Sequence, residues 1–414
     1  MEQEFLKAGY ELTKKDSKAD IYVINTCTVT NMAERKSRQM LRRAKQINSN
    51  AIVVVCGCYA EVAKKELESI EDIDIIISDK EKANIVEIVE NFDKDKLKIK
   101  EYTNSEKAEF VEYGTVTYTE KNRAVIKVQD GCNMFCTYCI IPYARGRIRS
   151  RKIENIVEEI KSIAMEGIKE VVITGIHIAS YGKDFENENI SLIDLLEKIN
   201  EINGIERIRL GSLEPTIITP DFLKRLTKLE KICDHFHLSL QSGCDATLKR
   251  MNRKYTTKQF NQITDLLRSA YPNVHLTTDI IVGFPGETDE EFNITYKFLK
   301  DINFYKMHIF KYSRRTGTVA EKMLNQIPEQ IKEARSKKLI ELSNINEETY
   351  NKNYIGKMVK VLFEEKEGEY FKGHTSNYML VKVKSNDIKN KIINQMLEVI
   401  ITGLDGIELI GKIN

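Results

Sequence analysis

The sequence has no long apolar run, little cysteine and almost no net charge. No run approaches the roughly 18 residues that a membrane-spanning helix needs, and no secretory signal opens the sequence as written, so no membrane partner is predicted. Only 8 of 414 residues are cysteine, and their partial grouping favours a reducing cytoplasm and metal chemistry over secretion with disulfides. The net charge of +2 neither supports nor excludes a nucleic-acid partner, because local basic patches matter more than the total.

The remaining composition is that of a globular protein. Hydrophobic residues make up 42% and charged residues 30% of the chain, a soluble balance. The length suggests two or three domains. There is no low-complexity segment and no repeat with a solenoid period.

Three cysteines lie close together in the stretch 130–139. Cys132, Cys136 and Cys139 have the spacing C-x3-C-x2-C, a soft ligand set suited to an iron–sulfur cluster or to Zn. A structural Zn site needs a fourth ligand nearby, and no Cys or His stands between Cys139 and His177. The pattern therefore favours a [4Fe–4S] cluster with one open iron, and buried structural thiols are the alternative.

The first 110 residues alternate strands and helices. Strands are predicted at 19–26, 51–55 and 73–77, and helices at 31–46, 60–69 and 82–91. This alternation predicts a parallel sheet with both faces covered, in which ligands collect at the carboxyl ends of the strands. Cys27 and Cys58 both fall at such ends, so they are either ligands of one site or packing residues.

Residues 121–345 contain six strand–helix units. The six strands are predicted at 123–128, 170–174, 207–210, 235–240, 275–282 and 304–312. Such units either open into a sheet or close into a barrel, with reactive groups at the carboxyl ends of the strands. Polar residues and glycines follow these strands, at 174–182, 212–215, 239–243 and 279–287.

Two further segments complete the chain. The charged stretch 92–120 is predicted to be a linker. In residues 346–414 five short strands with turn residues between them predict a small barrel of the OB type, which often binds RNA. A purely structural barrel is the alternative.

A basic run follows the three cysteines. Arg145, Arg147, Arg149 and Arg151 alternate in it. Such a run is often a solvated face, but arginine forks suit phosphates and carboxylates. We therefore treat these four as RNA- or carboxylate-binding candidates.

The cysteine segment GCNMFCTYCIIPYARGRIRSR resembles the cluster loop of radical S-adenosylmethionine (SAM) enzymes, and more narrowly that of the methylthiotransferases. The resemblance covers nearly the whole chain. It implies an α/β protein with a methylthiotransferase N-terminal domain (1–110), a radical SAM partial (β/α)6 barrel (121–345) and a TRAM domain (346–414). It also implies a [4Fe–4S] cluster and SAM as cofactors. SAM would contact the following residues: Tyr138, Thr174, Gly175, Gln241, Asp279 and Gly283.

Two further segments, INTCTVTNMAERKSRQ and VVVCGCYAE, are similar to cysteine motifs that hold a second, auxiliary [4Fe–4S] cluster in that family. Cys27 and Cys58 match two of its three ligands. The family's first motif, Gly-Cys-x-x-Asn, is missing, so this ligand set is incomplete here. We expect either that the natural chain begins upstream of Met1, or that the auxiliary site is defective or recruits Cys56.

Among the family's substrates, the segments ITGIHIASYGKD and RLGSLEP are most similar to the subgroup that acts on threonylcarbamoyladenosine 37 of tRNA. The implied reaction is methylthiolation at C2 of that adenosine, with two SAM molecules, two clusters and an electron donor such as flavodoxin or ferredoxin. Isopentenyladenosine 37 and a ribosomal-protein aspartate are the alternative substrates. A non-catalytic RNA-binding remnant is the third possibility, because the auxiliary ligands are incomplete.

Overall fold

The computed structural model describes residues 1–14, 17–28, 31–79, 81–92, 110–112, 122–186, 189–385 and 392–413. The chain divides into two compact units: residues 1–116, 130–149 and 313–322 form the first, and residues 117–129, 150–312 and 323–414 form the second. The predicted linker, 92–120, lies outside the described residues except for 92 and 110–112. In the described part of the chain, no helix is long and apolar enough to cross a membrane.

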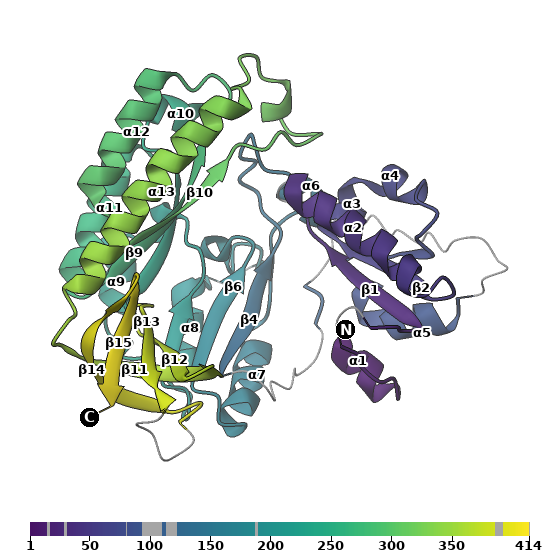
Figure 1. Ribbon diagram of the computed structural model, residues 1–414, viewed down its shortest axis with the longest axis horizontal. Helices are drawn as coiled ribbons and strands as arrows, with labels where there is room; N and C mark the ends of the chain where they lie inside the picture. Colours follow the sequence, from purple (N-terminus) through teal and green to yellow (C-terminus); the bar gives the residue numbers. More distant parts are fainter. Residues whose placement is uncertain are drawn as a thin grey trace. The chain divides into compact units, whose positions relative to one another are not determined.

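The first unit is built on a parallel sheet in the order β1-β2-β3 (Figure 1). Its strands are β1 (Ile21–Thr26), β2 (Ile52–Gly57) and β3 (Ile75–Ile76). Its helices are α1 (Glu2–Lys7), α2 (Asn31–Ile47), α3 (Cys58–Val62), α4 (Lys64–Glu68), α5 (Ile85–Glu90) and α6 (Ile141–Arg145), with the 3-10 helices η1 (Glu81–Asn84) and η4 (Ala320–Lys322). Side chains along β2 alternate between two apolar clusters: Val53 and Val55 pack with Leu41 of α2, and Val54 packs with Phe5 of α1. The sheet is therefore covered on both faces, as predicted.

One helix prediction in this unit is wrong in detail. A single helix was expected over 60–69, but α3 begins at Cys58 and ends at Val62, and α4 starts at Lys64. Ala63 between them has φ −118° and ψ 32°, outside helical values. Cys58 is the first residue of α3 and directly follows the end of β2 at Gly57.

The second unit holds the six predicted strand–helix units. Its strands are β4 (Arg123–Asp130), β5 (Arg149–Ser150), β6 (Glu170–Gly175), β7 (Arg207–Leu210), β8 (His235–Gln241), β9 (His275–Val282) and β10 (Lys306–Lys311). Its helices are α7 (Ile153–Met165), α8 (Leu192–Asn200), α9 (Pro220–Leu226), α10 (Asp245–Arg250), α11 (Thr257–Ala270), α12 (Asp289–Ile302) and α13 (Glu329–Lys352), with η2 (Ile178–Ser180) and η3 (Pro215–Ile217).

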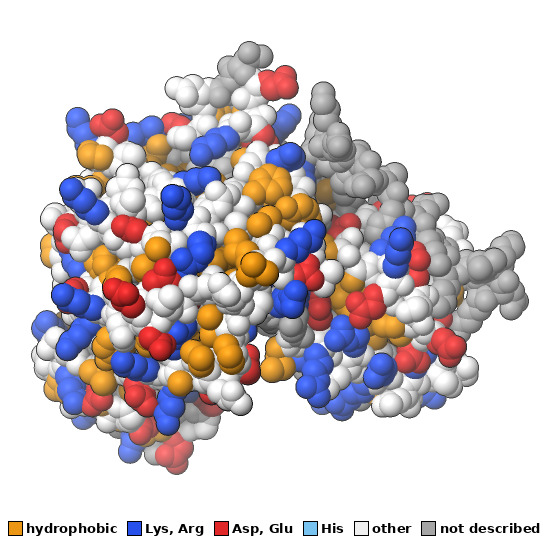
Figure 2. Space-filling view, turned by 90° about the horizontal axis from the view of Figure 1, so that it is seen from above, with side chains coloured by type: hydrophobic (Ala, Val, Ile, Leu, Met, Phe, Trp, Pro, Cys, Tyr) orange, Lys and Arg blue, Asp and Glu red, His pale blue; other side chains and the backbone are white. Residues whose placement is uncertain are grey.

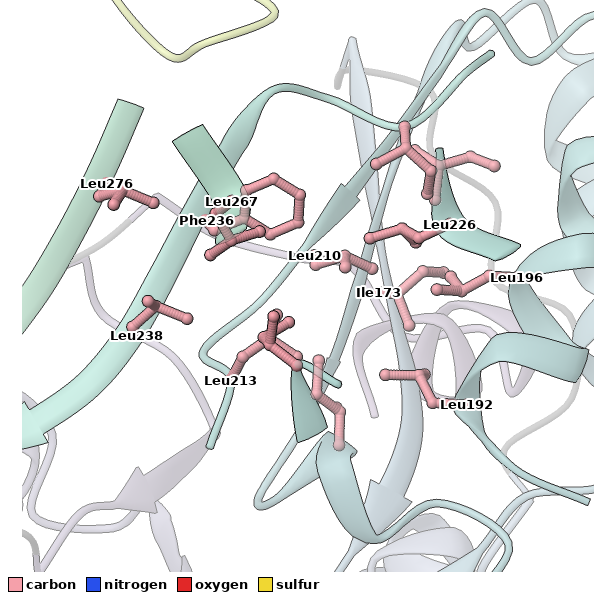
Figure 3. Close-up of a cluster of buried hydrophobic side chains, with 14 of the residues drawn as sticks. Ile173, Leu192, Leu196, Leu210, Leu213, Leu226, Phe236, Leu238, Leu267 and Leu276 are labelled. Atoms are coloured by element: carbon pink, nitrogen blue, oxygen red, sulfur yellow. The ribbon is translucent and has the colours of Figure 1, made fainter. Parts of the chain in front are cut away.

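These strands form a partial barrel in two sheets, β5-β4-β6-β7 and β10-β9-β8. Two isolated parallel bridges connect the two sheets. Ile208 of β7 pairs with Ile232, and Leu213, in the loop after β7, pairs with Leu238 of β8. Figure 3 shows how leucines from the strands meet leucines from the surrounding helices to form one core. The predicted fold class is confirmed: parallel α/β layers, a partial barrel and a closed five-stranded barrel at the end of the chain.

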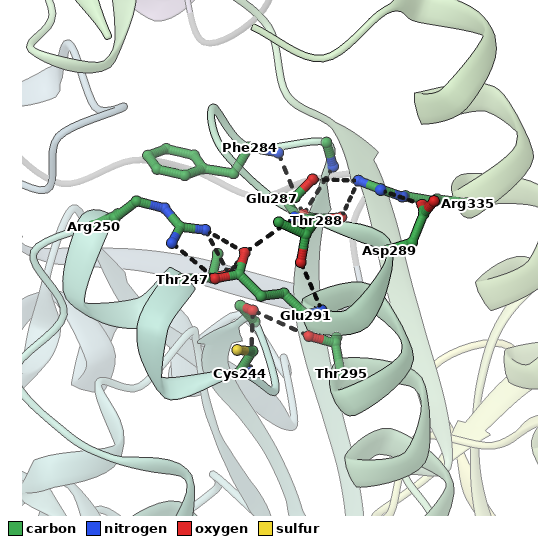
Figure 4. Close-up of polar contacts among 12 residues, drawn as sticks. Cys244, Thr247, Arg250, Phe284, Glu287, Thr288, Asp289, Glu291, Thr295 and Arg335 are labelled. Carbon is green, nitrogen blue, oxygen red and sulfur yellow. Dashed lines mark hydrogen bonds and ion pairs between the residues drawn. The ribbon is translucent and has the colours of Figure 1, made fainter. Parts of the chain in front are cut away.

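The turn after β9 is fixed to α13 by a buried ion pair (Figure 4). Glu287 accepts the backbone N–H of Gly283 at 3.0 Å and that of Phe284 at 3.3 Å. Arg335 of α13 donates to Glu287 at 2.8 Å and to Asp289 at 2.7 Å. The conformation of this strand end is therefore set by a distant helix.

The C-terminal barrel has the strand order β11-β12-β13-β15-β14. The strands are β11 (Met358–Glu367), β12 (Tyr370–Thr375), β13 (Leu380–Lys384), β14 (Met396–Asp405) and β15 (Glu408–Ile413). Alternate residues fill its interior, among them Val361, Phe363 and Val381. Five strands were predicted and five are present among the described residues.

This barrel docks on the amino ends of β6 and β7. Arg207 donates to the carbonyls of Lys360 and His374, at 2.8 and 2.9 Å. Arg209 donates to the carbonyl of Ser376 at 2.8 Å and to Glu170 at 2.7 Å. The C-terminal barrel therefore contacts β6 and β7 at the ends away from their carboxyl edge.

Histidine 275, at the start of β9, gives this unit a testable pH dependence. Its ring is 1% exposed and stacks on Tyr305 with centroids 4.1 Å apart. Burial lowers the pKa of His275 from 6.5 to about 3. Between these values the unfolded chain binds a proton that the folded chain does not, so stability falls as the pH falls.

We expect the wild-type protein to lose about 2 kcal/mol more unfolding free energy than His275→Phe between pH 7 and pH 5. Urea denaturation at both pH values measures this. Tyr305→Phe is the control and keeps the wild-type slope, because burial raises the pKa of Tyr305 far above this range. Equal slopes for wild type and His275→Phe would contradict the assignment.

Candidate functional site

The three cysteines lie on the loop between β4 and α6, in the first unit. The loop closes on itself through Cys132 N–H to the Gly146 carbonyl at 3.1 Å and Cys139 N–H to the Cys136 carbonyl at 2.9 Å. All three thiols are partly exposed, so an outside group can reach them. Tyr138 is half-buried in the same loop.

The setting of these thiols suits thiolate ligands. The N–H of Met134 points at Cys132 Sγ, 3.4 Å away, and such N–H groups stabilise cluster-bound sulfur. Among the described residues, no three His, Cys, Asp or Glu side chains form a ready-made group for a metal ion. The fit to a [4Fe–4S] cluster therefore rests on the donor set and on the loop that carries it.

Glycine 131 is required where this loop leaves the strand. Its φ is +71°, and a Cβ there would lie 1.8 Å from the Arg147 carbonyl oxygen. Gly167, in a turn with φ +86°, has nothing within 4 Å of its would-be Cβ. Both glycines have a positive φ, but only at Gly131 would an added Cβ clash with a neighbouring atom.

We expect Gly131→Ala to displace the cysteine loop and lower bound iron and SAM cleavage more than about tenfold, while Gly167→Ala keeps both. Both variants carry the strain of a positive φ, so the difference isolates the clash. Iron content and 5′-deoxyadenosine formation measure the outcome. Full iron content in Gly131→Ala would contradict this reading of the loop.

A buried charge cluster lies beside the loop. The Arg145 guanidinium pairs with Asp79 and also contacts Asp130 at 3.6 Å. Its Nε donates to Cys58 Sγ at 3.1 Å. Burial raises the pKa of the Cys58 thiol, and the positive charge of Arg145 opposes that rise. Lys82 adds a second cation by pairing with Asp79 at 2.5 Å.

Cys27 and Cys58 follow the carboxyl ends of two adjacent strands. Strands β1 and β2 are paired in parallel up to Thr26 and Gly57, and each cysteine follows directly. Cys27 is exposed and Cys58 is buried. Cys56 is fully buried in the apolar cluster around α1, with its Sγ 3.8 Å from the Ile24 carbonyl, and so acts as a packing residue.

The four arginines of the basic run lie in different settings. Arg145 and Arg149 both face Asp130, and Arg151 pairs with Glu159. Arg147 is the one of the four with an exposed side chain, and its guanidinium lies 4.9 Å from the ring centroid of Phe135. Figure 2 shows acidic and basic side chains interspersed over the face it presents.

In the second unit, Thr174, Gly175, Gln241 and Gly283 lie at or just after the carboxyl ends of strands, and Asp279 lies within β9. Thr174 and Gly175 end β6, where a Cβ on Gly175 would lie 2.8 Å from the Gln129 carbonyl oxygen. Gln241 ends β8 with φ +69°. Asp279 of β9 is half-buried and its carboxylate lies 3.2 Å from His237. Gly283 N–H, by contrast, is already bonded to Glu287.

Three polar residues at this edge were not predicted as site residues. His177 follows β6, Glu214 follows β7, and Arg253 lies after α10. Arg253 pairs with Glu214 at 2.6 Å, and His177 Nε2 lies 4.0 Å from the same carboxylate. The polar segment 212–215 after the third strand contained the signal for Glu214, whereas nothing in the sequence separated His177 from an ordinary core histidine.

Comparison with known proteins places these features in context. Residues 126–299 match the radical SAM superfamily, and residues 1–78 match the family described as "Uncharacterized protein family UPF0004". Over 398 residues the chain is 39% identical to threonylcarbamoyladenosine tRNA methylthiotransferase MtaB of Bacillus subtilis (strain 168), covering 94% of this chain and 88% of that protein.

Two other relatives widen the comparison. The tRNA-2-methylthio-N(6)-dimethylallyladenosine synthase of Clostridium beijerinckii is 37% identical over 416 residues, covering 98% of this chain and 90% of that protein. Among solved structures, the radical SAM methyltransferase TsrM of Kitasatospora setae superposes with a TM-score of 0.53 at 14% identity, covering 70% of this chain and 61% of that one. The last likeness concerns the fold alone.

Proposed function

The chain belongs to the radical SAM tRNA methylthiotransferases, and on this basis we propose that it methylthiolates C2 of N6-threonylcarbamoyladenosine at position 37 of tRNA. The observation that carries the proposal is the near full-length similarity to the B. subtilis protein of that activity. The substrate is then the anticodon loop of tRNA, and we propose that the enzyme acts in the cytoplasm.

Membership of the superfamily implies a [4Fe–4S] cluster and SAM. We propose that Cys132, Cys136 and Cys139 hold the cluster, which when bound supplies the electron for radical formation from SAM. Backbone hydrogen bonds at Cys132 and Cys139 hold the loop, and the N–H of Met134 donates to Cys132 Sγ. A small electron-transfer protein such as flavodoxin or ferredoxin would act as the donor.

We further propose that Cys27 and Cys58 contribute to an auxiliary [4Fe–4S] cluster. Their position at adjacent carboxyl ends supports this. Arg145, hydrogen-bonded to Cys58, would stabilise its thiolate form.

SAM contacts are proposed for Tyr138, Thr174, Gly175, Gln241 and Asp279, and for the backbone at Gly283. The half-buried Asp279 carboxylate can accept hydrogen bonds from hydroxyl groups. RNA contacts are proposed for the basic run, for which the exposed Arg147 is the best placed: Arg145, Arg147, Arg149 and Arg151.

Nucleoside mass spectrometry of tRNA from a strain lacking this gene tests the proposal. We expect 2-methylthio-N6-threonylcarbamoyladenosine to disappear and N6-threonylcarbamoyladenosine to accumulate, with other methylthio nucleosides unchanged. Complementation with the intact gene restores the nucleoside. An unchanged level in the deletion strain would refute the assigned substrate.

Isopentenyladenosine 37 is the second candidate substrate, because the Clostridium relative is almost as similar as the Bacillus one. The same experiment separates the two. Loss of 2-methylthio-isopentenyladenosine instead would assign the chain to that activity.

A further inference from the structure

Two neighbouring side chains at the carboxyl edge of the partial barrel each carry a buried acceptor atom. His177 Nε2 and Glu214 Oε1 are fully buried, and neither has a hydrogen-bond partner among the described residues. They come from the loops after β6 and β7, and His177 Nε2 lies 4.0 Å from Glu214 Oε2. Buried polar atoms are rarely left unbonded, so this pair calls for an outside partner.

The hydrogen bonds of His177 decide which kind of partner fits. Ser180 Oγ donates its proton to the His177 carbonyl at 2.8 Å, so at Nδ1, 2.5 Å away, it must accept. Nδ1 therefore carries the proton and Nε2 presents a lone pair. Burial, followed by the nearby charges of Lys183 and Arg253, lowers the pKa of His177 to about 4, which keeps the ring neutral.

The hydrogen bonds of Glu214 lead to the same conclusion. Its Oε2 is bound by Arg253 at 2.6 Å, and Arg253 is itself held by the Ser239 carbonyl at 2.9 Å and by Tyr255 Oη at 3.0 Å. Burial raises the pKa of Glu214, and the Arg253 charge opposes this. With Arg253 fixed beside it, Glu214 is a carboxylate, and Oε1 is a second acceptor.

Two acceptors on neighbouring side chains suit a group that offers at least two N–H or O–H donors. We infer that His177 and Glu214 bind the donors of the N6 substituent of the substrate adenosine. This rests on the proposed function. A threonylcarbamoyl substituent adds a second ureido N–H and a hydroxyl to the N6–H that both modified adenosines carry, whereas an isopentenyl substituent adds no donor. The exposed Lys183, whose charge acts on both His177 and Glu214, suits the carboxylate of the same substituent.

The pair is therefore a specificity element. A site that hydrogen-bonds a substrate group rejects an analogue that lacks it, because the buried acceptors are then left unpaired. An isopentenyl group offers no donor to either atom. Discrimination between the two modified adenosines would arise here without any change in the cysteine loop.

Fluorescence anisotropy with the anaerobic holoenzyme tests this inference. The probes are labelled anticodon stem–loop RNAs that carry threonylcarbamoyladenosine, isopentenyladenosine or unmodified adenosine at position 37. The wild-type enzyme should prefer the threonylcarbamoyl RNA about tenfold over the adenosine RNA, the effect of about one net buried hydrogen bond. His177→Phe and Glu214→Gln should each reduce this preference to less than about twofold while leaving affinity for the adenosine RNA unchanged.

His374→Phe, in the C-terminal barrel, is the matched control and should retain the full preference. SAM affinity of each variant is measured by equilibrium dialysis. Retention of the preference in both variants would overturn the inference, and so would a loss of SAM affinity with the RNA preference intact, which would assign the pair to the ammonium group of SAM. If the wild-type enzyme itself shows no preference, the assigned substrate fails, and the inference fails with it.

Discussion

Replacement of Cys136 by alanine should abolish SAM cleavage. Changing even the outer partners of metal ligands typically costs 10- to 100-fold in activity, so loss of one of three thiolate ligands should lower 5′-deoxyadenosine formation by more than about a hundredfold. Iron content should fall in parallel, because two thiols and an open loop hold a cluster weakly. Anaerobic assays with dithionite as reductant measure both.

Cys244→Ala is the control for this experiment. Cys244 is a buried free cysteine in the second unit, directly before α10. Its side chain makes no capping hydrogen bond to that helix. Its variant should cleave SAM at the wild-type rate. Cleavage that survives in Cys136→Ala would remove the cysteine loop from the proposed chemistry.

Replacement of Glu170 by alanine should have the largest effect on stability. Glu170 is fully buried at the start of β6 and pairs with Arg209 at 2.7 Å and Arg207 at 3.7 Å. Burial would raise the pKa of Glu170, but the two arginines outweigh it and the net shift is downward. Removal of the carboxylate leaves two buried guanidinium groups uncompensated, which costs about 3–5 kcal/mol.

The same variant should loosen the C-terminal barrel, since both arginines also hold its backbone carbonyls. Urea denaturation gives the free energy, and limited proteolysis reports whether strands β11–β15 are released. Glu197→Ala breaks the surface pair with Arg225 and should cost no more than about 1 kcal/mol. Equal effects of the two substitutions would show that the buried pair is not a main tie between the barrels.

Long apolar elements could be predicted from the sequence almost to the residue. Strand β9 begins and ends at the predicted residues, and strand β8, predicted at 235–240, extends one residue further. Short elements could not. Helices α6 and α10 have 5 and 6 residues, which is too few for a helical period to emerge from the pattern.

The candidate site was predictable only in part. Cys132, Cys136 and Cys139 are close in sequence, and Cys27 and Cys58 follow predicted strands, so their placement could be inferred. The pairing of Arg145 with Asp79 joins residues 66 positions apart, and no local pattern reports such a contact. His177 is similar: its importance comes from an unbonded ring nitrogen next to Glu214, a contact between two loops that only the folded chain makes.

The most direct test of the assigned activity uses the anaerobically reconstituted enzyme with SAM, a reductant and two anticodon stem–loop RNAs in competition. One RNA carries threonylcarbamoyladenosine and the other isopentenyladenosine at position 37. Mass spectrometry of the digested RNA should find the methylthio group on the threonylcarbamoyl nucleoside alone. Methylthiolation of the isopentenyl RNA instead, or SAM cleavage with neither RNA modified, would contradict the account.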